Sequence, residues 1–119
     1  MKIIKIPELN IEIQKEIHHK EKSYNELIKE FPDLEDKLPT YAELQFLRNS
    51  NKYRKLLNLD DTWEFVKQED LVAKKNGFVA RFVAYSSRAV LDCGRLPGSR
   101  YPSLGVRFVN RKEDLKWKT

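Results

Sequence analysis

The stretch "GFVARFVAYSSRAVLDCGRLPGSRYPSLGVRFVN", residues 77–110, differs in composition from the rest of the chain. It contains five Arg but no Lys, Glu, Gln, Met or Trp, whereas the other 85 residues contain 15 Lys, 11 Glu, 3 Gln, 1 Met and 2 Trp. Burial in a sheet excludes Lys and Glu, but it should exclude Arg as well. The composition of this stretch therefore needs a further explanation.

The same stretch also predicts part of a sheet. The residues of "FVARFVA", 78–84, and of "GVRFV", 105–109, alternate in the way that is typical of strands. No period holds over residues 85–103, so we expect a long loop region there, with one short strand near residues 90–93.

Two capping boxes predict two helices in the first half of the chain. Ser23 precedes Glu26 in "SYNE", and Thr40 precedes Glu43 in "TYAE", each by three residues. The proline of "FPD" should end the first helix, and the second should run to about Asn49. Four residues of the second helix are expected to face the core: Tyr41, Leu44, Phe46 and Leu47.

Weaker signals complete the pattern. Alternation over residues 1–13, interrupted by Pro7, predicts two early strands or a strand and an extended segment. Residues 51–61 predict a short helix or turn, "TWEFVKQ" at 62–68 predicts a strand, and Asn76-Gly77 is a turn sequence. Together these signals predict one α+β domain over residues 1–119, with two helices, a mostly antiparallel sheet and a long loop region.

Charge is divided unevenly along the chain, which has a net charge of +5. Residues 1–71 carry 12 basic and 15 acidic side chains, whereas residues 72–119 carry 11 basic and 3 acidic ones. Such asymmetry is typical of a protein that binds an acidic partner or nucleic acid, and also of one with complementary halves or a basic tail. The tail, residues 111–119, is expected to be solvated, with Trp117 holding it down.

The sequence contains no signal for membrane insertion or export. Met1 is followed by "KIIKIPELNIEI", which is not a signal peptide, and no apolar run reaches the length of a membrane span. Cys93 is the single cysteine, which excludes an internal disulfide and a Cys-based zinc site. We therefore expect no membrane insertion, and the compartment stays open.

The patterns that usually accompany catalysis are absent or weak. There is no phosphate-binding Gly-rich loop and no nucleophile elbow. His18 and His19 are adjacent and point apart, so solvated surface histidines are favoured over a metal pair. Cys93 is far in sequence from both, so a small buried residue is favoured over a nucleophile. We expect a protein that is not an enzyme and that carries no metal or cofactor.

Residues 77–110 have instead the composition of a binding surface. Tyr provides a large contact area at low entropic cost, Ser adapts its hydrogen bonds, and Tyr and Arg are common among the residues that dominate binding energy. Arg also stacks on aromatic rings and donates to backbone carbonyls, which can hold an irregular loop in place.

Two stretches resemble a known family. "LPTYAELQFLRNS", residues 38–50, is similar to a helix of C-type-lectin-fold domains of the formylglycine-generating-enzyme type, and "LGVRFV", residues 104–109, resembles their closing strand. A subset of these domains serves as the variable proteins of diversity-generating retroelements, whose C-terminal region is rewritten by mutagenesis at adenines. The "GGSW" type of stretch that many members carry is replaced by "NGFVARF" here, which implies a compact, divergent version of viral or archaeal kind.

The resemblance implies a C-type-lectin-like fold and an explanation for the missing residue types. Variable codons in that family are typically AAY, and because the third base stays a pyrimidine they never reach Lys, Glu, Gln, Met or Trp. Residues 77–110 are then the variable ligand-binding region. By resemblance and side-chain type, its candidate variable positions are Tyr85, Ser87, Val90, Asp92, Gly94, Leu96, Ser99, Tyr101 and Ser103. The five arginines of the region are candidates for scaffold: Arg81, Arg88, Arg95, Arg100 and Arg107.

The hypothesis favoured by these observations is a ligand-recognition protein with a diversifiable surface, whose partner is a protein or surface ligand. One alternative is a lectin-like domain with a fixed site for carbohydrate or protein, and a second, less favoured one is a nucleic-acid-binding protein that uses the basic half. A homo-oligomer is compatible with the sequence, because the N-terminal strands offer edges for pairing. The localisation stays open between virion-associated and cytoplasmic.

Overall fold

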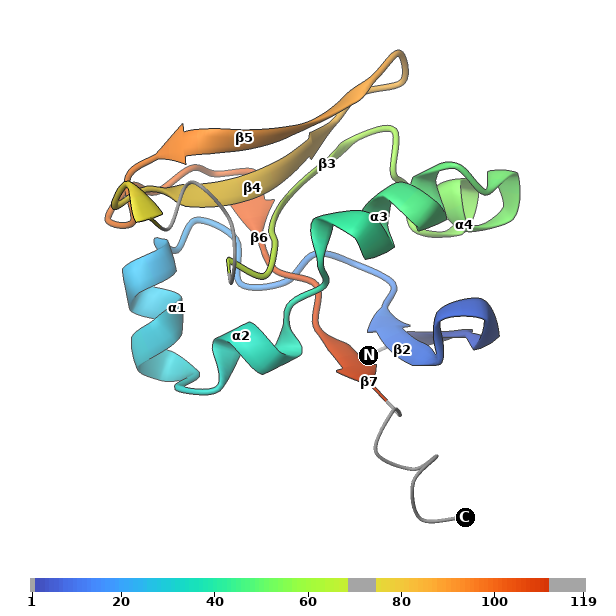
Figure 1. Ribbon diagram of the computed structural model, residues 1–119, viewed down its shortest axis with the longest axis horizontal. Helices are drawn as coiled ribbons and strands as arrows, with labels where there is room; N and C mark the ends of the chain where they lie inside the picture. Colours follow the sequence, from blue (N-terminus) through green and yellow to red (C-terminus); the bar gives the residue numbers. More distant parts are fainter. Residues whose placement is uncertain (1, 69–74, 112–119) are drawn as a thin grey trace.

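Two sheets organise the part of the chain that the computed structural model describes, residues 2–68 and 75–111 (Figure 1). The strands are β1 (Ile3–Ile6), β2 (Ile11–Gln14), β3 (Thr62–Phe65), β4 (Val79–Ala84), β5 (Ala89–Arg95), β6 (Leu104–Gly105) and β7 (Val109–Arg111). One sheet has the strand order β1-β2-β7 and the other has the order β5-β4-β3-β6. Within the described residues the pairings are antiparallel except for β3 with β6, so the expected α+β class with a mostly antiparallel sheet is confirmed.

Short helices connect the strands. They are the 3-10 turn η1 (Pro7–Leu9) and the α-helices α1 (Tyr24–Glu30), α2 (Leu34–Lys37), α3 (Tyr41–Arg48) and α4 (Asn51–Leu56). Both predicted capping boxes are present: the Ser23 and Thr40 hydroxyls accept hydrogen bonds from the N–H groups of Glu26 and Glu43 at 3.1 and 3.0 Å. The two predicted helices are therefore α1 and α3, to which the structure adds α2 and resolves residues 51–56 as a helix.

The two faces of the larger sheet pack against different helices. One core includes Leu44 and Leu47 of α3 together with Phe82 of β4, and the other includes Leu27 of α1 and Phe65 of β3. Figure 1 shows α3 and α4 on one side of the molecule and α1 and α2 on the other. All six residues of β4 are buried, because this strand is covered on both faces.

Core predictions for α3 are confirmed at three of four positions. Leu44 and Leu47 are fully buried, and Tyr41 is partly buried with its ring 6.0 Å from that of Phe82. Phe46 was wrongly expected to face inward, since its side chain is 42% exposed. Phe46 lies on the outer side of α3. Consecutive side chains of a helix with 3.6 residues per turn point in different directions, and the next residue, Leu47, faces the core.

The expected long loop over residues 85–103 is shorter than predicted. Residues 89–95 form β5, a seven-residue strand that pairs with β4 along its length. The register shifts between Val79 and Arg81, so that an extra residue of β5 bulges out near Cys93 and Gly94. This bulge breaks the two-residue period, which is why alternation revealed only part of the strand.

The prediction that "GVRFV" forms a single closing strand is also wrong. Leu104–Gly105 forms β6 in the larger sheet, Val106 makes an isolated bridge to His18, and β7 begins at Val109 in the smaller sheet. Between them Arg107 is 1% exposed and turns inward. The chain leaves one sheet and joins the other at this residue.

The remaining predictions agree with the structure only in part: the strand expected over residues 62–68 ends at Phe65, and Arg111, expected in a solvated tail, belongs to β7 and pairs with Glu43. β1 and β2 pair antiparallel on either side of the Pro7 turn. Asn76-Gly77 forms a turn, with Gly77 at φ +79, but it lies within the long connection from β3 to β4 and does not close a tight hairpin. Trp117 and the tail at residues 112–119 lie outside the described residues.

Candidate functional site

The tip of the β4–β5 hairpin is held from outside the 77–110 segment. The turn closes with a hydrogen bond from the Tyr85 N–H to the Arg88 carbonyl at 2.8 Å. Arg48, at the end of α3, donates to the Tyr85 carbonyl at 2.6 Å, and Arg54 of α4 donates to the Ser86 carbonyl at 2.7 Å. These bonds engage the backbone only, so the side chains at the tip are left facing outward.

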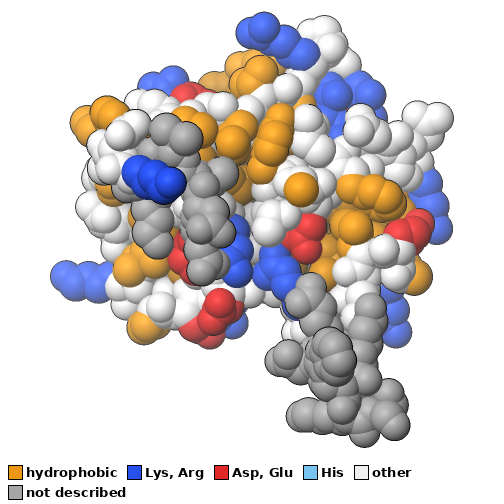
Figure 2. Space-filling model, in the orientation of Figure 1, with side chains coloured by type: hydrophobic (Ala, Val, Ile, Leu, Met, Phe, Trp, Pro, Cys, Tyr) orange, Lys and Arg blue, Asp and Glu red, His pale blue; other side chains and the backbone are white. Residues whose placement is uncertain are grey.

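The nine candidate positions lie along this hairpin and the segment that follows it. Tyr85 is 44% exposed and Leu96 is 60% exposed, which is unusual for large apolar side chains. None of the nine is buried: Tyr85, Ser87, Gly94, Leu96 and Ser103 are exposed, and Val90, Asp92, Ser99 and Tyr101 are partly exposed. Figure 2 shows that Lys and Arg side chains gather at the upper end of the molecule, where Figure 1 places the hairpin tip.

Asp92 and Tyr101 hold two arginines in a stack. The Asp92 carboxylate accepts hydrogen bonds at 3.0 Å from the Nε atoms of both Arg81 and Arg95. The Arg81 guanidinium lies 5.0 Å from the centre of the Trp63 ring and 5.1 Å from that of Tyr101, and Arg95 lies 5.2 Å from the Tyr101 ring. At these distances the rings attract the cations, so this stack attaches residues 95–101 to the sheet.

The environment of Asp92 favours its ionised form. Burial raises the pKa of the carboxyl group, but hydrogen bonds from the Gly94 N–H and from Arg81 and Arg95 outweigh it and leave the pKa below its ordinary value. The Asp92 carboxylate therefore lies as an anion between two cations at neutral pH.

The other arginines of the segment differ in their contacts. Arg107 is bound deep inside, and Arg100 makes two hydrogen bonds with the Glu26 carboxylate at 2.7 and 2.6 Å. Arg88 is exposed and has no ion pair or side-chain hydrogen bond within the described residues. Four of the five thus make scaffold contacts, as their chemistry predicts.

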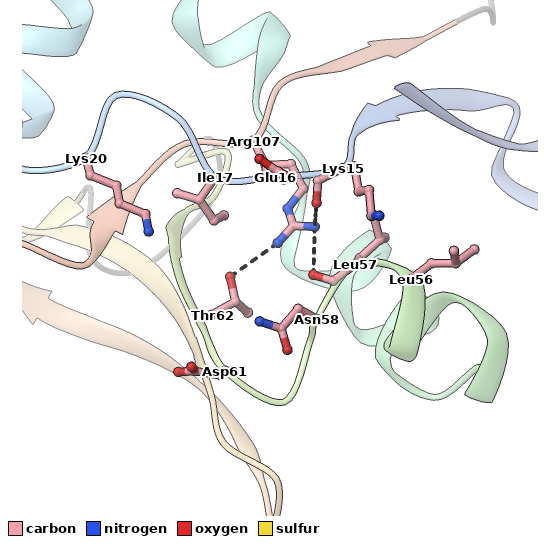
Figure 3. Close-up of a pocket in the computed structure, with 10 residues that line it drawn as sticks. All are labelled: Lys15, Glu16, Ile17, Lys20, Leu56, Leu57, Asn58, Asp61, Thr62 and Arg107. Atoms are coloured by element: carbon pink, nitrogen blue, oxygen red, sulfur yellow. Dashed lines mark hydrogen bonds between the residues drawn. The ribbon is translucent and has the colours of Figure 1, made fainter. Parts of the chain in front are cut away.

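A groove that sequence reasoning missed runs beside the hairpin. We call it the side groove; its walls are residues 15–20 and 56–61. One hollow of about 380 Å³ lies between these walls above Arg107 (Figure 3), and a second of about 220 Å³ continues from it to Trp63, Tyr85 and Ser103. The two hollows share four lining residues: Ile17, Lys20, Asp61 and Thr62. No local pattern predicts this groove, because only the tertiary fold brings its walls together.

Arg107 forms the base of the side groove. Figure 3 shows its guanidinium pointing between the walls, where it donates to the Lys15 and Leu57 carbonyls at 2.9 and 3.0 Å. Behind the groove it forms an ion pair at 3.2 Å with Glu64, which is completely buried. The Arg107 Nε and the Glu64 Oε1 atoms have no hydrogen-bond partner within residues 2–68 and 75–111.

Side chains considered for catalysis or metal binding lie in ordinary surroundings. His19 is not a solvated surface residue as expected, because its ring packs 5.0 Å from Phe31 and 6.0 Å from Phe108. Cys93 was expected to be buried but is only partly so. Within residues 2–68 and 75–111, no three His, Cys, Asp or Glu side chains are grouped so that they could hold a metal ion.

No helix among the described residues is both long enough and apolar enough to cross a membrane.

Comparison with known proteins found no relative of this chain. Neither protein-family models, nor curated proteins, nor solved structures gave a match to the chain.

Proposed function

We propose that this chain is a ligand-recognition protein without catalytic activity, in which a C-type-lectin-like scaffold carries a diversifiable surface formed by residues 77–110. Its partner is a protein or a surface ligand. The proposal includes the origin of the diversity, which is retroelement-directed mutagenesis of the codons in this segment.

The observation that carries the proposal is that the two faces of β5 have different surroundings. Leu91 and Cys93 pack against the core, whereas the candidates Val90 and Asp92 alternate with them on the opposite face and Gly94 stands exposed at the bulge. A strand of this kind can change Val90 and Gly94 while its inner residues keep the fold, whereas Asp92 is constrained by its contacts with Arg81 and Arg95. The backbone clamps from Arg48 and Arg54 support the same function, because they hold the hairpin tip without using its side chains.

Two matched double variants test this difference between the faces. Val90→Ser with Gly94→Ser changes only candidate positions, and we expect the free energy of unfolding to fall by less than about 1 kcal/mol. Leu91→Ser with Cys93→Ser changes the inner positions, and we expect a loss of about 2–3 kcal/mol because partly buried apolar contacts are removed. Urea unfolding measures both, and equal losses in the two variants would contradict a diversifiable outer face.

The encoding DNA tests the origin of the diversity. We expect a near-copy of the DNA for residues 77–110 close to the gene, differing from it at adenines and accompanied by a reverse-transcriptase gene. If the flanking DNA lacks such a copy, the surface is a fixed binding site and the retroelement part of the proposal is wrong.

A further inference from the structure

The side groove is continuous with the proposed variable surface. Its second hollow is lined by Tyr85 and Ser103, which are candidate variable positions, and by Trp63, which lies outside the segment. The Trp63 and Tyr85 rings meet edge to face, with centres 6.5 Å apart and planes at 87°. This end of the groove is therefore a corner with two aromatic walls, suited to an apolar or aromatic side chain.

The walls of the groove are held at a set separation. Arg107 donates to the carbonyl of Lys15 in one wall and to that of Leu57 in the other. Because one buried guanidinium binds both walls, the groove exists without a ligand and needs no ordering when a ligand enters.

Backbone strain is concentrated in and beside the same walls. The described residues include four non-glycine residues with positive φ, and three of them are His19 at 54°, Glu21 at 66° and Asn58 at 53°. His19 and Glu21 stand on either side of Lys20. Conformations of this kind persist where the surrounding structure enforces them and are frequent at ligand sites.

Two opposite charges face the groove without side-chain partners in the described part of the chain. Lys20 and Asp61 line both hollows, and neither makes an ion pair or a side-chain hydrogen bond within the described residues. Elsewhere on the surface some exposed charges are paired, as Lys22 is with Glu30 and Arg100 with Glu26, and others such as Arg88 are not, within the described residues. The second hollow thus offers one cation and one anion beside an aromatic corner, whereas Lys15 and Glu16 line the first hollow alone.

We propose that the side groove binds an extended peptide segment of the ligand protein that carries an acidic, an apolar and a basic side chain in close succession. The acidic side chain binds Lys20, the basic one binds Asp61, and the apolar one enters the corner of Trp63 and Tyr85. The inference rests on the proposed function and adds to it an anchor whose charged residues, Lys20 and Asp61, lie outside residues 77–110, whereas Tyr85 and Ser103 at its apolar end are candidate variable positions.

Three blocked tripeptides test the inference in the full chain. They are Ac-Lys-Phe-Glu-NH2, Ac-Ala-Phe-Ala-NH2 and Ac-Lys-Phe-Lys-NH2, titrated to millimolar concentration while backbone amide chemical shifts are followed by NMR. We expect the first peptide to shift amides at residues 17–20 and 58–63 and to bind several-fold more tightly than the other two, since each exposed ion pair contributes little.

A charge-reversal variant sharpens the test. Lys20→Glu should weaken Ac-Lys-Phe-Glu-NH2 several-fold and make Ac-Lys-Phe-Lys-NH2 the preferred peptide. Lys29→Glu, at an exposed lysine of α1, is the control with the same charge change, and the preference should stay as in the unmodified chain. Thermal unfolding followed by circular dichroism confirms that both variants fold.

The outcomes separate this inference from the proposed function. Equal affinity for the three peptides, or shifts that lie away from the groove, would overturn the groove assignment while the tests of β5 and of the encoding DNA still stand. Peptide binding with the expected preference in a chain that has no template copy would keep the groove and remove the diversified surface.

Discussion

Replacing Arg107 with Leu should remove much of the stability of the chain. Arg107 is 1% exposed, and its partner Glu64 is completely buried. Among the described residues, the substitution leaves the Glu64 carboxylate with the Thr62 hydroxyl alone, which donates to it at 2.7 Å. It also removes the donor that binds the carbonyls of Lys15 and Leu57.

The magnitude follows from the loss of one member of a buried pair. An uncompensated buried charge costs about 3–5 kcal/mol, and a buried carbonyl without a donor adds about 1 kcal/mol or more. We therefore expect Arg107→Leu to lower the free energy of unfolding by at least about 4 kcal/mol, a large share of the roughly 5–15 kcal/mol that domains of this size possess.

A double-mutant cycle with Glu64→Gln identifies the cause. In the Arg107→Leu background, Glu64→Gln removes the unpaired charge and should restore about 1–3 kcal/mol, whereas in the unmodified chain the same change should destabilise. Urea unfolding at pH 7, followed by tryptophan fluorescence and circular dichroism, gives all four free energies. A loss below about 1 kcal/mol for Arg107→Leu, or the same effect of Glu64→Gln in both backgrounds, would refute the reasoning.

Three further substitutions test other parts of the structure. Gly105→Ala should destabilise by about 1–3 kcal/mol in thermal unfolding, because the new Cβ would lie 2.5 Å from the His18 carbonyl oxygen, a backbone atom that cannot move alone; an unchanged melting temperature would contradict this close approach. Asp92→Asn should lower stability at pH 7 by about 1–2 kcal/mol. The pKa of Asp92 is lower in the folded chain than the unfolded value of about 3.9. The contribution of Asp92 to stability is therefore complete above that value and is lost as the pH falls through the folded pKa. The variant should thus lose less stability on acidification than the unmodified chain, and parallel pH profiles would contradict this. Thr40→Ala should cost about 1 kcal/mol in thermal unfolding by removing the hydroxyl that caps α3, and a loss indistinguishable from zero would contradict the role of this cap.

Local sequence rules predicted the elements whose stability is local. The capping boxes at Ser23 and Thr40 depend on residues three positions apart, so the starts of α1 and α3 follow from the sequence. The prediction of a strand at residues 78–84 is confirmed as β4, although its burial does not alternate because both faces are covered. The composition of residues 77–110 marked the segment as unusual, but it did not predict the β4–β5 hairpin, since a long loop with one short strand was expected over residues 85–103.

Tertiary structure decided the features that depend on partners far along the chain. "GVRFV" alternates like a strand, but Arg107 reaches the carbonyls of residues 15 and 57 and the carboxylate of residue 64, and this divides the segment between two sheets. The bulge in β5 conceals a seven-residue strand from any test of alternation. The side groove has no sequence signature at all, since Lys20 and Asp61 line the same groove only because separate segments fold against one another. Periodicity and capping report on neighbouring residues, whereas a groove is defined by contacts across the whole chain.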